Sequence, residues 1–135
     1  MKIDIDQGSI QDSKADTIIV NLFEGVSHPG GATAAVNQVL KGAISELIAN
    51  GDFKGETGEI AVLYPRGVLP AKRALVVGLG SADAFDLEIV RRAAAAAIKR
   101  ARELNAEEVA TIVHGGGLGA LPIASAAQAT VEGTL

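Results

Sequence analysis

Three short glycine loops are the stretches of this sequence whose residue types could bind a ligand. They are Gly30-Gly31, Gly78-Leu79-Gly80 and the run 115–119. Glycine lets a backbone turn sharply, and free N–H groups at the start of a helix can hold phosphate oxygens. Glycine is equally common in short loops that bind nothing. In the middle loop the dinucleotide pattern G-x-G-x-x-G fails at its third glycine, where Asp83 stands. This loop is therefore either a phosphate turn or an ordinary turn with Asp83 as helix cap.

Catalytic side chains are scarce. The chain has no cysteine and two histidines, His28 and His114. Neither histidine has a second histidine or a carboxylate at the spacing of a metal site. We interpret His28 as a solvated loop residue and His114 as a residue at a strand end. The nucleophile pattern G-x-S-x-G and the Walker Gly-Lys-Ser/Thr are missing as well. We therefore expect no catalytic residue, no metal ligand and no cofactor site in this chain.

Strand and helix patterns alternate along the chain. Short apolar runs predict strands at 2–6, 17–20, 59–64, 74–77 and 108–113. One helical stripe runs from Thr33 to Ile48 and ends at Asn50-Gly51, and a second runs from Leu87 to Leu104. The second includes five alanines, 93–97, whose smooth surface suits close packing on a sheet or a subunit contact. Pro122 opens a third helical segment that continues to the end of the sequence. This order predicts an α/β fold, a three-layer α/β/α sandwich with a mixed, mostly parallel sheet.

Composition narrows the class of protein. A chain of 135 residues fits one domain that can bury a core without disulfides. No apolar run reaches the roughly 18 residues of a membrane span, and the charged start lacks the apolar core of a signal peptide. We expect a cytoplasmic protein without a membrane partner. The net charge of −4 and the low aromatic content argue against nucleic acid as a partner.

The loops and strands together resemble macro domains, the ADP-ribose-binding α/β/α fold. The run 15–21, A-D-T-I-I-V-N, is similar to the macro-domain run ending in V-N-A-A-N, and 30–32 is similar to its G-G-G loop. Segments 57–59, 69–72 and 77–78 follow the middle of that pattern. The resemblance implies a vestigial ligand loop whose candidate residues are Asn21, Gly30, Gly31, Gly116, Gly117 and Gly119. Two departures weaken it: Glu24 replaces the second asparagine, and no acidic residue follows Gly30-Gly31. A carboxylate beside the loops would repel phosphate.

A second resemblance covers nearly the whole chain. It is similar to the amino-terminal domain of the leucyl (cytosol) aminopeptidases, which has a macro-like fold. The shared pattern is G-D-F-K-G at 51–55, then Gly58-Glu59, then Lys72-Arg73 leading to 77–80, then the alanine-rich helix through 91–93. This implies a longer parent enzyme, a hexamer that removes amino-terminal residues from peptides with two divalent metals, zinc or manganese. The family's metal-binding stretch N-T-D-A-E-G-R belongs to a carboxyl-terminal domain and is not found in residues 1–135.

Two hypotheses follow. In the first, residues 1–135 form a single macro-like domain, an amino-terminal fragment of a longer aminopeptidase, whose role is structural and oligomerising rather than catalytic. Its partners would be the carboxyl-terminal catalytic domain and further copies of the parent. In the second, the chain is a binding module for ADP-ribose or a related nucleotide. Glu24 and the missing loop aspartate favour the first hypothesis.

Overall fold

A mixed four-stranded sheet forms the centre of the computed structural model, which describes residues 8–114, 130 and 132–134. Its strands are β1 (Thr17–Leu22), β2 (Ile60–Leu63), β3 (Arg73–Gly78) and β4 (Val109–Thr111), in the order β2-β3-β1-β4. β1 runs parallel to both β3 and β4, whereas β2 runs antiparallel to β3. The predicted mixed, mostly parallel sheet is confirmed. The strand predicted at 2–6 lies outside the described residues.

β1 and β3 are the central strands and are covered on both faces. Every residue of β1 is buried, as are Ala74–Gly78 of β3. Alternate residues face opposite sides, so Ile18 and Val20 join one apolar cluster while Ile19 joins another with Leu75 and Val77. Continuous apolar runs without polar alternation are what such doubly covered strands require.

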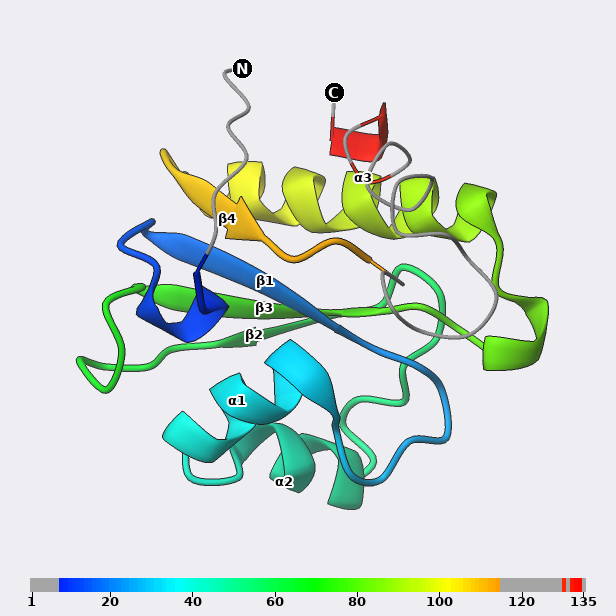
Figure 1. Cartoon of the computed structure of the whole chain (residues 1–135), viewed down its shortest axis with the longest axis horizontal. Coiled ribbons are helices and arrows are strands. Elements are labelled where there is room, and N and C mark those ends of the chain that lie inside the picture. Colours follow the sequence, from blue (N-terminus) through cyan, green and yellow to red (C-terminus); the bar gives the residue numbers. More distant parts are fainter. Residues whose placement is uncertain (1–7, 115–129, 131, 135) are drawn as a thin grey trace.

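Helices cover the two faces of the sheet and complete the three layers (Figure 1). α1 (Gly31–Val39) and α2 (Ala43–Ala49) lie on one face, and α3 (Leu87–Glu103) lies on the other. Two 3-10 turns, η1 (Ile10–Asp12) and η2 (Ala82–Ala84), lie in connecting segments. No helix in the described part of the chain is long and apolar enough to cross a membrane.

The single helix predicted from Thr33 to Ile48 is in fact two helices. Between them Lys41 and Gly42 take left-handed backbone angles, with φ of 57° and 85°. The Asn37 side chain fixes the break, because its oxygen accepts hydrogen bonds from Ile44 N at 2.9 Å and Ser45 N at 3.1 Å. These N–H groups open α2 and would otherwise lack a partner within the helix. The apolar stripe continues across the break, which is why it suggested one helix.

The helix cap expected at Asp83 is wrong, because α3 begins only at Leu87. Asp86 is its cap, and its carboxylate accepts a hydrogen bond from Ile89 N at 2.9 Å. Asp83 lies in η2, where its backbone N–H donates to the Ser81 hydroxyl at 3.3 Å. The glycine turn after β3 therefore does not lead directly into a helix.

The alanines of α3 pack against two different parts of the chain. Ala93, Ala97 and Ala101 belong to the apolar cluster on the sheet. Ala94 instead lies beside the terminal turn, where a Cβ added to Gly133 would stand 2.9 Å from the Ala94 Cβ and collide with the carbonyl oxygen of Arg91. An ion pair of 3.0 Å between Arg91 Nε and Glu132 Oε1 holds the same turn. Most of the small-residue face is thus used inside the chain.

Candidate ligand-binding edge of the sheet

The carboxyl ends of β1 and β3 meet at one edge of the sheet, where open α/β folds usually bind ligands. The loops that leave these strands are tied together by backbone hydrogen bonds. Leu79 N donates to Leu22 O at 2.9 Å, and Glu24 N donates to Gly80 O at 2.9 Å. The candidate residues on β1 and at the start of α1 lie at this edge.

Asn21, the candidate at the end of β1, is engaged in a buried polar chain. Its amide nitrogen lies 3.0 Å from Nδ1 of His114, and its backbone oxygen accepts from the Thr33 hydroxyl at 2.7 Å. The His114 backbone N–H donates to the Thr130 hydroxyl at 3.2 Å. This set, which we call the Asn21–His114 network, joins β1, α1, the end of β4 and the terminal turn. The Asn21 side chain is therefore committed to a neighbour within the chain.

His114 is deeply buried, with 1% of its surface exposed. Burial lowers the pKa of the imidazole from 6.5 to about 4, so the ring is neutral near pH 7. Because Nδ1 accepts from the Asn21 amide, the ring proton of the neutral form belongs on Nε2. Its position at a strand end was predicted; its partnership with a residue 93 positions earlier could not be read from spacing. His28 is exposed in its loop, as predicted.

Gly30 and Gly31 are the accessible candidates. Gly30 is the residue before α1, and Gly31 begins the helix with φ of 56°. Both are exposed, and a Cβ at either would meet nothing within 4 Å. Thr33 of the first turn binds Asn21, so the structure brings Asn21 and this helix start together. Gly116, Gly117 and Gly119 lie outside the described residues.

The turn Gly78-Leu79-Gly80 is covered and offers no approach to a phosphate. A Cβ at Gly78 would collide with the Glu56 carbonyl, and one at Gly80 would collide with the Thr57 hydroxyl. Gly80 N also donates to Gly55 O at 2.8 Å, which holds the segment 55–58 over the turn. These glycines serve close packing of the segment 55–58 on the end of β3.

The Glu59 carboxylate occupies backbone N–H groups of the loop before it, a contact that sequence reasoning missed. Its Oε1 accepts from three consecutive backbone N–H groups, those of Lys54 at 3.1 Å, Gly55 at 2.9 Å and Glu56 at 3.0 Å. Three successive N–H groups aimed at one point form an anion-binding concavity. Here the anion is a side chain of the same loop. The only sequence signal is a carboxylate four residues after a glycine, which is too common to be diagnostic.

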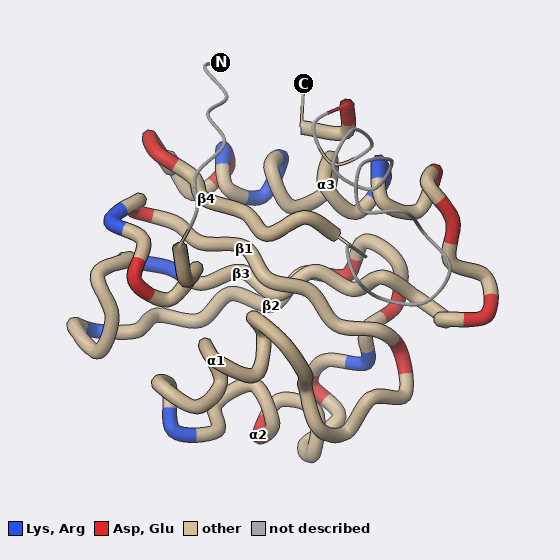
Figure 2. The backbone as a smooth tube through the Cα atoms, viewed as in Figure 1, with Lys and Arg blue, Asp and Glu red and all other residues tan. Residues whose placement is uncertain are grey.

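Acidic residues predominate around this edge. Figure 2 shows acidic segments gathered where β1 and β3 end, while the middles of the strands carry no charge. An open hollow of about 320 Å³ lies here between two loops, lined by Glu24, Gly25, Val26, Ser27, Ile48, Gly51, Phe53 and Lys54. The described residues contain no group of three or more His, Asp or Glu side chains that could hold a metal ion. The described part of this edge therefore presents no donor set for a metal centre.

Asp16 lies at the opposite, amino edge of the sheet, as its position before β1 predicts. Its carboxylate accepts from the backbone N–H groups of Glu107 at 2.9 Å and Glu108 at 3.0 Å, and Arg73 lies 3.4 Å away. Partial burial alone would raise the pKa of Asp16, but hydrogen bonds from Thr17, Glu108 and Glu107 and the charge of Arg73 outweigh it and hold the pKa below its usual value. Asp16 thus ties β1 to the segments that begin β3 and β4.

Solved structures with the same arrangement define the class of fold. The Trypanosoma brucei macrodomain matches with a TM-score of 0.76 and 19% identity, over 94% of this chain and 51% of that one. The macrodomain of Mycobacterium tuberculosis DarG matches with a TM-score of 0.74 and 18% identity, over 95% of this chain and 86% of that one. A tomato leucine aminopeptidase mutant matches with a TM-score of 0.72 and 22% identity, over 96% of this chain and 26% of that one. The fold is macrodomain-like.

Sequence comparison gives the family. Residues 19–135 match the model of the cytosol aminopeptidase family, N-terminal domain. A probable cytosol aminopeptidase of Alkaliphilus metalliredigens is 33% identical over 134 residues, 99% of this chain and 27% of that protein. One of Alkaliphilus oremlandii is 31% identical over 115 residues, 85% of this chain and 23% of that protein. The chain belongs to the cytosol aminopeptidase family and corresponds to its amino-terminal domain. It spans about a quarter of the length of these relatives.

Proposed function

We propose that this chain acts as a non-catalytic structural and oligomerisation domain of a cytoplasmic, metal-dependent aminopeptidase. The catalytic domain of the same parent chain would hold the two divalent metals, zinc or manganese, and the parent would assemble as a hexamer. The observation that carries this proposal is the state of the carboxyl edge of the sheet. The backbone N–H groups of residues 54–56 are taken by Glu59, Asn21 is bound to His114, and the glycine turn after β3 is covered.

Two measurements test this proposal. The purified chain is assayed on leucine-nitroanilide with manganese or zinc, and we expect no turnover. Metal-dependent turnover that survives repurification would show that the chain is itself catalytic. The corresponding amino-terminal quarter is then removed from the Alkaliphilus metalliredigens relative, and the mass of the assembly is measured by light scattering. We expect a smaller assembly; an unchanged mass would refute the oligomerising role.

A second candidate function is binding of ADP-ribose or a related nucleotide. The observation in its favour is the exposed Gly30-Gly31 start of α1, which carries no acidic residue in its first turn. One structural neighbour, the Trypanosoma brucei macrodomain, is described in complex with ADP. Against it, Glu24 lines the hollow in the loop that leads to that helix, and the N–H groups of 54–56 across the hollow already bind a carboxylate. We place this function second.

A further inference from the structure

The hollow at the carboxyl edge of the sheet has walls whose backbone is fixed. One wall is the loop after β1, where Glu24 N donates to Gly80 O at 2.9 Å. The other is the segment before β2, where Lys54 N donates to the Glu59 carboxylate at 3.1 Å. The two walls also touch, because a Cβ added to Gly55 would stand 2.9 Å from the backbone nitrogen of Glu24. The hollow is therefore formed before any ligand arrives, as small-molecule sites usually are.

The floor of this hollow is apolar and is part of the core. Phe53 is 2% exposed and belongs to the apolar cluster on the α1 side of the sheet. Val26 and Ile48 are half-buried against the same cluster. The volume of about 320 Å³ is at the lower end of the roughly 300–1,000 Å³ of small-molecule sites. The floor therefore suits one small apolar group.

Two opposite charges line the walls. Glu24 lies on the side of the loop after β1, and Lys54 lies on the side of the segment before β2. Both residues are exposed, and no ion pair within the described part of the chain involves either of them. A carboxylate accepts hydrogen bonds from an ammonium group, and a lysine donates them to a carboxylate. The hollow thus offers a partner for each charge of a zwitterion.

We propose that this hollow binds a free amino acid with an apolar side chain. Its ammonium group lies against Glu24, its carboxylate lies against Lys54, and its side chain packs on the floor at Phe53. A nucleotide fits this arrangement less well, because it carries no ammonium group and Glu24 would repel its phosphates. The inference does not depend on the oligomerising role. The parent proposed above would release amino acids, so the site would bind a product of the catalytic domain.

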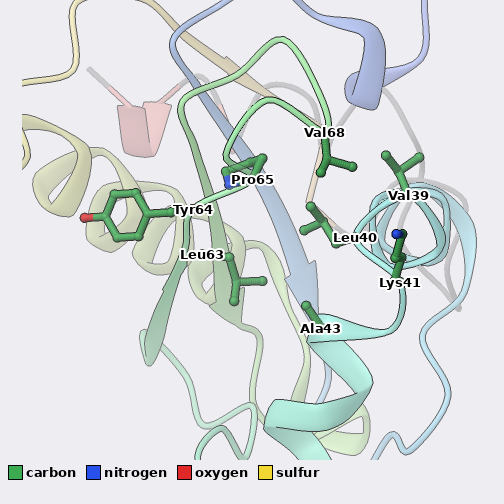
Figure 3. A pocket seen from close by; sticks show the side chains of 8 residues that line it. All are labelled: Val39, Leu40, Lys41, Ala43, Leu63, Tyr64, Pro65 and Val68. Carbon is green, nitrogen blue, oxygen red and sulfur yellow. The ribbon is translucent and has the colours of Figure 1, made fainter.

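A second apolar hollow lacks this pair of charges. It measures about 200 Å³ and lies between the segment 63–68 and the turn joining α1 to α2 (Figure 3). Lys41 is the one charged residue among the eight that line it. An amino acid would find a partner there for its carboxylate but none for its ammonium group. Binding should therefore be confined to the hollow beside Glu24.

The affinity should be low, because both charges are exposed to water. Exposed ion pairs gain little over hydration, so each charge should change the dissociation constant only about two- to fivefold. A ligand of this size in an open hollow should bind with a dissociation constant on the order of 1–10 mM.

Binding is measured by NMR on the isotope-labelled chain, with leucine added up to about 50 mM, a range set by the expected constant. We expect saturable shifts of the amide signals of Gly25, Ser27 and Lys54, with Leu40 and Val68 beside the second hollow unchanged. Leucinamide lacks the carboxylate and N-acetylleucine lacks the ammonium group, so each should bind about two- to fivefold more weakly than leucine. Glycine has no side chain for the floor and should bind more weakly than leucine as well.

Two variants assign the ends of the ligand. Glu24→Gln should weaken leucine about two- to fivefold and should not weaken N-acetylleucine, which has no ammonium group to lose a partner. Lys54→Gln should weaken leucine similarly and should not weaken leucinamide. The matched controls are Glu107→Gln and Lys72→Gln, at exposed residues of the amino edge, and both should bind leucine as the unchanged chain does. The analogues use the unchanged chain, so the test holds even if a variant fails to fold.

Three results would overturn the proposal. They are shifts that do not saturate, equal affinity for leucine and both analogues, and variants at Glu24 and Lys54 that bind leucine unchanged. Shifts centred on Leu40 and Val68 would also refute it, because they would place the ligand in the second hollow. None of these results concerns the mass of the assembly, so the oligomerising role stands or falls by its own measurement.

Discussion

Acidification should destabilise this fold through one buried side chain, His114. The imidazole is 1% exposed, and its Nδ1 faces the amide nitrogen of Asn21 at 3.0 Å. Protonation at Nδ1 would set two donors against each other and place a charge in the core. The pKa is lowered from 6.5 to about 4 in the folded chain, because burial disfavours the charged ring. The unfolded chain therefore binds this proton first as the pH falls.

The sign and size follow from that difference. The part of the folding stability that depends on neutral His114 is fully present above pH 6.5. It is lost as the pH falls toward 4, below which the loss levels off. The full shift corresponds to about 3 kcal/mol, and roughly 2 kcal/mol of it should be lost by pH 5. Asp16, whose pKa is lowered from 3.8, contributes its own loss only at lower pH, so the two effects separate.

Urea denaturation followed by circular dichroism at pH 7, 6, 5 and 4.5 measures this loss. His114→Gln should be less stable at pH 7 and should flatten the profile between pH 6.5 and 4, since glutamine does not titrate. His28→Gln, which replaces an exposed histidine, is the matched control and should keep the wild-type profile. The reasoning would be refuted if the free energy of unfolding were equal at pH 7 and pH 5. It would also be refuted if His114→Gln kept the wild-type slope of the free energy of unfolding against pH.

Three further predictions concern packing, the strand clamp and ligands. Gly133→Ala should lower the free energy of unfolding by about 1–3 kcal/mol, because its Cβ would collide with the Arg91 carbonyl. An unchanged denaturant midpoint would mean that the terminal turn does not pack on α3. Asp16→Asn should cost about 1–3 kcal/mol, since its amide oxygen can keep the two backbone N–H groups that Oδ2 accepts, but its amide nitrogen cannot accept from the Thr17 hydroxyl and Arg73 as Oδ1 does; the same urea series checks it, and an unchanged free energy of unfolding would contradict it. ADP-ribose should bind with a dissociation constant above about 1 mM by calorimetry, because Glu24 and the occupied N–H groups oppose a diphosphate; a saturable micromolar signal would favour the nucleotide module.

Local patterns predicted the central strands and α3 because these elements are decided by apolar periodicity. The break at Lys41-Gly42 could not be predicted in the same way, since the apolar stripe continues through it and only the Asn37 side chain marks the start of α2. The cap at Asp86 was missed because Asp83 has the same chemistry three residues earlier and nothing local shows that η2 intervenes.

The candidate site was harder to predict than the fold. The macro-domain resemblance named Asn21 and Gly30-Gly31 as candidates, and the structure places them at one edge. It could not show that Asn21 would be bound to His114, because that contact depends on how β1 and β4 pair. The role of Glu59 was invisible for a similar reason: it depends on the curvature of the loop before it, which is set by packing on Gly78 and Gly80.

The Glu59 carboxylate also sets how this loop responds to free anions in solution. A phosphate or a nucleotide arriving at the N–H groups of Lys54, Gly55 and Glu56 competes with an anion attached to the same loop by a few bonds. A tethered competitor keeps a constant local concentration that dilution does not lower. A free anion must therefore displace the carboxylate to bind this loop, so its apparent affinity is lowered by the same factor at every protein concentration.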